Sequence, residues 1–205
     1  MDFSVPMALA DFVPVILFLA GAIILQRDLY NKMSKGAFAL FACGTINVFC
    51  AGALKALYKL LYAAGVCDFQ PLSAMFFPVQ SIGFILAGLG LVALLTHRQG
   101  KTAAVAAPAL FSGTFIFVGM MVAGVISIAA CMSVLCKKLG RGKLAVFFIV
   151  QAVCCMCMGY LSSKDFAQAY MNWLAEGINI VGQSCFLLGC VKAHKAGLAE
   201  LTLAK

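Results

Sequence analysis

Six long apolar runs recur along the chain, and they constrain its fold more than any other feature. They lie at about residues 12–26, 36–54, 73–96, 108–136, 144–161 and 169–191. An apolar helix of about 20 residues crosses roughly 30 Å of hydrocarbon. Because the runs are continuously apolar and do not alternate, they predict helices and not the strands of a membrane barrel. With 64% hydrophobic and 11% charged residues, we expect an all-α, polytopic integral membrane helix bundle with six transmembrane helices.

Similar segments recur in the same order in the two halves of the chain, which indicates an internal duplication. The pairs are "LYNKMSKGAFALFA" (29–42) with "LCKKLGRGKLAVFF" (135–148), "VQSIGF" (79–84) with "GQSCFL" (182–187), and "THRQGK" (96–101) with "AHKAGL" (193–198). We therefore predict two three-helix repeats, 1–98 and 115–197. A connecting segment at 99–114 and a tail at 198–205 complete the chain.

The number of crossings is left open by two opposing arguments. With six crossings the basic residues divide almost evenly between the two sides of the membrane. If the stretch 99–136 crosses twice, every basic cluster except Lys164 falls on one side, as the positive-inside rule expects. Residues 99–112 offer only about 14 positions, or roughly 21 Å of helix, so this seventh crossing would be short or re-entrant. Six crossings with inverted halves remain the alternative. We expect a bacterial cytoplasmic membrane and an outside N-terminus.

A polar stripe lies within the last apolar run. Its members are spaced four, three and four residues apart and so share one helix face: Asn172, Glu176, Asn179 and Gln183. Such a face avoids lipid. It is typical either of the wall of a solute pathway or of hydrogen bonding between helices.

Two lysines follow the second apolar run. If the span ends near residue 54, Lys55 and Lys59 extend into the headgroups. The alternative is a basic outer vestibule in which Glu176 acts as the counter-ion. The second interpretation needs the seven-crossing topology, because only then do these groups lie on the same side.

The third run of each half contains a glutamine followed by a serine. Amide and hydroxyl groups near the middle of the membrane suit recognition of a small polar solute, and they suit helix packing equally well. The predicted solute pathway consists of Gln80, Ser81, Asn179, Gln183 and Ser184.

Ten cysteines raise the question of metal chemistry. Cys154, Cys155 and Cys157, with two neighbouring methionines, are soft ligands of the kind that copper(I) accepts. Adjacent helical residues point about 100° apart, however, and cysteine also packs well as a small apolar side chain. We predict no metal site and no cofactor.

These patterns favour a small transporter or channel that moves a small polar solute, an anion included, between two helical repeats. The alternatives are a non-transporting subunit or scaffold and, third, a copper-handling protein. Catalytic motifs are absent and carboxylates are few, so we do not expect an enzyme. The expected partners are the lipid bilayer and the solute, with a homo-oligomer left open. The +8 net charge fits anionic lipid better than nucleic acid, because the basic residues cluster at span ends.

Overall fold

The protein is a bundle of helices in a computed structural model that describes residues 4–96, 114–161 and 169–203. In chain order the elements are α1 (Val5–Ala10), α2 (Phe12–Leu29), η1 (Tyr30–Lys32), α3 (Lys35–Ala63), α4 (Pro71–Ala74), α5 (Phe76–Thr96), α6 (Thr114–Lys138), η2 (Gly142–Leu144), α7 (Ala145–Leu161) and α8 (Ala169–Lys195). Within these described ranges, six segments are long and apolar enough to cross a membrane. The predicted six-helix membrane bundle is confirmed at this level, and it fits an integral membrane protein.

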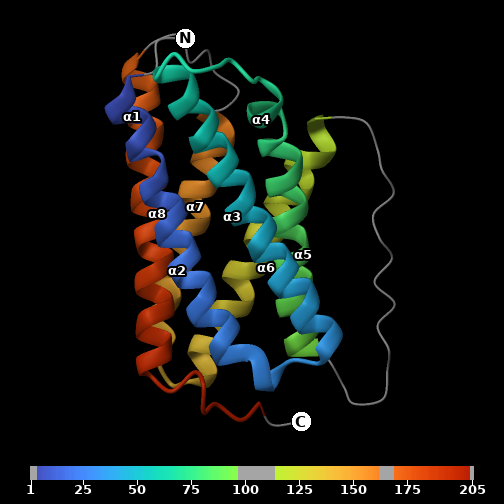
Figure 1. Cartoon of the computed structure of the whole chain (residues 1–205). Coiled ribbons are helices and arrows are strands. Elements are labelled where there is room, and N and C mark those ends of the chain that lie inside the picture. Colours follow the sequence, from blue (N-terminus) through green and yellow to red (C-terminus); the bar gives the residue numbers. More distant parts are fainter. Residues whose placement is uncertain (1–3, 97–113, 162–168, 204–205) are drawn as a thin grey trace.

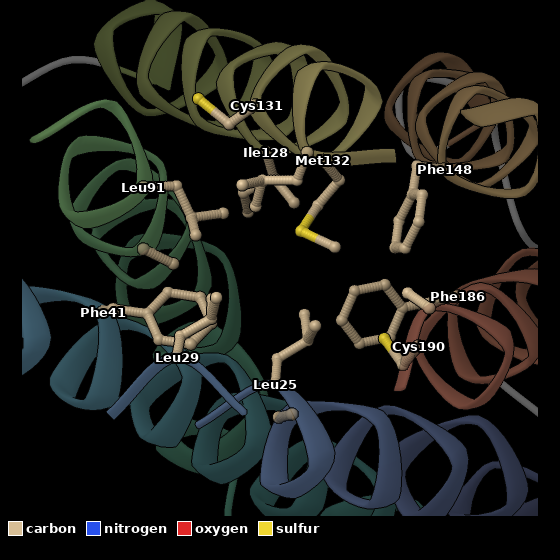
Figure 2. Packing of buried hydrophobic residues seen from close by; sticks show 14 of the residues in the cluster. Leu25, Leu29, Phe41, Leu91, Ile128, Cys131, Met132, Phe148, Phe186 and Cys190 are labelled. Carbon is tan, nitrogen blue, oxygen red and sulfur yellow. The ribbon is translucent and has the colours of Figure 1, made fainter. Parts of the chain in front are cut away.

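The six long helices form a closed ring. Around it, α2 packs against α3, α3 against α5, α5 against α6, α6 against α7, α7 against α8, and α8 against α2 again (Figure 1). Each helix sends buried apolar side chains toward the middle of the ring. Figure 2 shows Leu25, Phe41, Leu91, Met132, Phe148 and Phe186 in this position. The core is therefore shared by both halves of the chain.

Helices α5 and α6, although consecutive, run in the same direction. The ring of Phe77 lies 6.4 Å from that of Phe117, and further along both helices Gly88 lies against Ser127. Residue numbers therefore increase in the same direction along both helices. Thr96 and Thr114 consequently lie at opposite ends of the bundle (Figure 1). The predicted short crossing at 99–112 lies outside the described residues.

The first and last helices of the ring are also parallel neighbours. Phe18 stacks on Phe186 with ring centroids 5.3 Å apart. Further along the same pair of helices, Asp28 Oδ1 lies 2.8 Å from His194 Nδ1. These contacts join the first and last long helices and close the ring.

The two ends of the bundle differ in charge. We call the end that carries α1 and the C-terminal end of α3 the N-terminal face, and the opposite end the basic face (Figure 1). The described basic residues at or near the basic face are Arg27, Lys32, Lys35, Lys137, Lys138, Arg141, Lys143, Lys192 and Lys195. There, Lys32 Nζ donates hydrogen bonds to the carbonyl oxygens of Ala199 (2.7 Å) and Leu201 (2.8 Å). These bonds hold the chain that follows α8 against this face.

Helix α3 extends beyond the apolar run that predicted it. The run ends near residue 54, whereas the helix continues to Ala63. Gly65, two residues later, adopts a φ of 68° and so allows the left-handed turn that follows the helix. The N–H groups of Gly65 and Val66 donate to the carbonyl oxygens of Tyr62 and Leu61. Lys55 and Lys59 therefore lie on the last turns of the helix.

Candidate functional site

A cavity of about 780 Å³ lies within the half of the bundle that ends at the N-terminal face. Residues of all six long helices line it, together with Ser73 and Ala74 of α4. Volumes of this size are typical of small-molecule sites. The wall is mixed, because charged and amide groups alternate with aromatic and methionine side chains. An apolar ring of helices thus encloses a partly polar chamber.

The polar stripe of α8 lies along this cavity. All four of its members, Asn172, Glu176, Asn179 and Gln183, are lining residues. Their spacing places them on one face over about three turns. Gln183 and Glu176 are only 8% and 6% exposed. The stripe therefore faces the interior of the bundle and not the surrounding lipid.

Four charged side chains from three parts of the chain meet on the cavity wall. Lys59 of α3 forms an ion pair with Asp11, which lies at the break between α1 and α2. Glu176 of α8 interacts with Asp11 and, over longer distances, with Lys59 and Lys55. Lys55 Nζ lies over the ring of Phe76, 4.0 Å from its centre. The structure thus brings together the three residues predicted as a vestibule and adds Asp11.

Asp11 was not predicted as a site residue. A carboxylate that interrupts an apolar segment is expensive in a membrane, and this signal was available in the sequence. The sequence could not show which residue pairs with Asp11, because Lys59 lies on another helix 48 positions later in the chain. Asp11 is only 7% exposed. It therefore belongs to the interior of the site.

Three buried oxygen atoms on the wall have no hydrogen-bond donor among the described residues. They are Asp11 Oδ1, Glu176 Oε1 and Gln183 Oε1. Buried polar atoms are nearly always hydrogen-bonded in folded proteins. The site therefore has unused acceptor capacity that faces its own cavity.

The glutamine–serine pairs are divided between the cavity and the helix contacts. Gln80 and Gln183 both line the cavity. Ser81 is fully buried, and its hydroxyl donates to the carbonyl oxygen of Phe77 at 2.7 Å. Ser184 is partly buried and lies outside the cavity lining. Each glutamine therefore reaches the cavity without the serine that follows it.

Aromatic side chains close the cavity on the side of the basic face. Phe84 belongs to both the cavity lining and the buried core. Phe18 contacts its ring edge-on at 6.5 Å and stacks on Phe186, which in turn contacts Phe148 at 6.2 Å. Beyond them, Leu25 and other fully buried side chains fill the ring (Figure 2). We call this cluster of four phenylalanines the apolar seal.

The three clustered cysteines of α7 point in different directions. Cys155 lines the cavity, and its sulfur accepts a hydrogen bond from Gln151 at 3.2 Å. Cys154 packs against Gly182, whereas Cys157 is exposed. Within the described ranges, no three His, Cys, Asp or Glu side chains converge on a point that could hold a metal ion. This arrangement of the cysteines therefore does not support the copper-handling alternative.

Comparisons with known proteins found no family model, no curated protein and no solved structure that matches this chain.

Proposed function

We propose that the protein is a small integral membrane transporter that binds a small polar solute in the cavity and passes it between two three-helix halves. The observation that carries this proposal is a polar chamber inside an otherwise apolar bundle. Burying charged groups within a membrane is costly unless they serve a function or are paired. A purely structural bundle has no need of buried acceptors that remain without donors.

A carrier fits the geometry better than an open channel. A channel needs a continuous polar route, whereas the apolar seal separates the cavity from the basic face. In a carrier, the two halves move relative to one another and expose a central site to each side in turn. The present arrangement corresponds to the state that is open toward the N-terminal face.

The order of helices around the ring supports two equivalent halves, α2–α3–α5 and α6–α7–α8. Both contacts between halves, α5 with α6 and α8 with α2, are parallel. Two repeats that insert in the same orientation, around an axis along the bundle, would produce this pattern. An inverted repeat would make both contacts antiparallel. We therefore propose the duplication with parallel halves, in which residues 97–113 connect the two faces.

We further propose that the basic face lies in the cytoplasm and that the N-terminus lies outside. The positive-inside rule supports this orientation, because the basic residues of the described chain concentrate at one end of the bundle. The cavity then opens away from the cytoplasm. A solute would enter it from outside the cell.

Native cysteines allow a direct test of both water access and alternating access. In variants that each keep one cysteine, we compare Cys155 in the cavity, Cys190 beyond the seal, and Cys50, which is exposed on the lipid side of α3. A charged, membrane-impermeant thiol reagent should modify Cys155 from the N-terminal face. It should not reach Cys50, because hydrocarbon excludes the reagent.

Cys190 distinguishes a carrier from a scaffold. Its side chain is fully buried, so a carrier should expose it to the reagent slowly and from the basic face, when the halves open on that side. A protein in which Cys155 is never modified has a dry interior, and this result would end the transport proposal. Modification of Cys155 without any modification of Cys190 would favour a binding protein or scaffold.

A further inference from the structure

The unpartnered oxygen atoms of the cavity require a ligand that donates hydrogen bonds. Asp11 Oδ1 and Glu176 Oε1 belong to carboxyl groups that interact with each other and are more than nine-tenths buried. A primary ammonium group offers three donors and a positive charge. It can therefore satisfy both oxygen atoms at once.

Lys55 supplies a positive charge on the wall of the same cavity. Among the described residues it has no ion-pair partner within reach, and its ammonium group lies against the ring of Phe76. Lys59, one turn further along α3, is already paired with Asp11. Lys55 is thus the cation that remains available to bind an anionic group of a solute.

The four charged side chains that meet on the cavity wall comprise as many carboxyl groups as lysines. Two acidic residues, Asp11 and Glu176, and two lysines line the cavity. We call the part of the cavity that they line its charged end. A bound ion of a single sign would leave one charge unpaired beside Asp11 and Glu176, which are more than nine-tenths buried, and this is unfavourable. A zwitterion adds a charge of each sign and preserves the balance.

We propose that the cavity binds a zwitterionic amino acid. Its ammonium group contacts Asp11 and Glu176, and its carboxylate contacts Lys55. This inference names the substrate class of the proposed transporter and rests on that proposal.

The deeper part of the cavity selects the side chain. Gln183 lies seven residues beyond Glu176 on α8, which is about 10 Å along the helix axis. Gln183 Oε1 lacks a donor, and Gln80 lines the same cavity. An amino acid whose side chain ends in an N–H or O–H group can reach from the charged end to this acceptor. L-glutamine has the required length and donor.

Binding to the purified full-length chain tests the proposal without any membrane gradient. The standard L-amino acids are screened by thermal shift, and the affinity of L-glutamine is then measured by calorimetry. Two analogues each lack one charged group: 4-aminobutanamide has no carboxylate, and glutaramic acid has no ammonium. Each should bind roughly tenfold or more weakly than L-glutamine. L-methionine, of similar length without a side-chain N–H, should also bind more weakly.

Variants assign each charge to its residue. Lys55→Gln should weaken binding of L-glutamine roughly tenfold and leave binding of 4-aminobutanamide unchanged. Glu176→Gln should weaken L-glutamine similarly and leave glutaramic acid unchanged. Lys137→Gln, exposed at the basic face, should alter none of these affinities. The analogue series on the unaltered protein keeps the test valid if a variant fails to fold.

Two results would overturn the proposal. The first is the absence of a shift with every amino acid. The second is equal binding of L-glutamine and both truncated analogues. Because binding is measured apart from transport, its failure leaves the Cys155 and Cys190 results intact. Binding without access to Cys190 would instead reject transport and retain the amino-acid site.

Discussion

Phe18 and Phe186 stack in nearly parallel planes, 16° apart, and join the first and last helices of the ring between the cavity and the basic face. Both rings are buried. Phe186 also contacts Phe148, so a single side chain links α2, α7 and α8. The contact therefore closes the ring and closes the cavity at the same depth.

Replacing Phe186 with alanine should open the seal. The variant removes the stacked ring, and in a chain that retains only Cys190 we expect a charged thiol reagent to reach this cysteine from the N-terminal face. The protein should also lose about 3–5 kcal/mol of stability. Phe38→Ala, which removes an edge contact with Tyr30 near the basic face, is the control. Unchanged protection of Cys190 in the Phe186→Ala protein would show that other side chains close the cavity.

Gly44 should tolerate no side chain. A Cβ atom at this position would lie 2.3 Å from the backbone nitrogen of Ala87, so α3 and α5 would have to separate. We expect Gly44→Ala to cost about 1–3 kcal/mol of stability, measured by thermal unfolding of the purified protein. Gly119→Ala is the matched control, because a Cβ there meets nothing within 4 Å. It should be neutral or stabilising by up to about 1 kcal/mol. Equal effects of the two substitutions would contradict the close α3–α5 contact.

The contact between Asp28 and His194 should stabilise the closed ring. The carboxylate side chain is fully buried and both of its oxygens lie within 3.0 Å of Nδ1. His194→Ala leaves this carboxylate without its partner, and we expect a loss of about 2–3 kcal/mol. The double variant with Asp28→Ala should lose less than the sum of the two single variants. Additive losses in thermal unfolding would mean that the two side chains act independently.

Loop accessibility should distinguish the two faces. Cys67 is exposed just after the end of α3, whereas Lys143 is exposed after the end of α6, at the opposite end of the bundle. In intact cells, an impermeant thiol reagent should modify a chain whose single cysteine is Cys67. A chain whose single cysteine comes from Lys143→Cys should react only after the cells are permeabilised. Reaction of both in intact cells would contradict the parallel arrangement of α5 and α6.

The sequence was most informative where a pattern depends on one helix alone. Continuous apolar runs predicted the six long helices, and the spacing of Asn172, Glu176, Asn179 and Gln183 predicted one shared face. Both follow from helix geometry. The same geometry explains why Ser81 does not accompany Gln80 into the cavity, since neighbouring residues point about 100° apart.

Features that depend on several helices could not be read in the same way. The apolar run before Lys55 indicated the end of a span, yet α3 continues because Lys55 and Lys59 line a cavity whose other walls supply Phe76 and Asp11. The place of Asp11 in the site depends on this tertiary contact. The duplication and the seventh crossing stay predictions.

The apolar seal also determines where a membrane voltage acts. An aqueous cavity conducts ions and supports little potential difference, so the electric field concentrates across the dry layer between Phe84 and the basic face. Each elementary charge that crosses this layer experiences about 2.3 kcal/mol per 100 mV. In the proposed carrier, a solute without net charge would cross this layer with no electrical work on the solute itself.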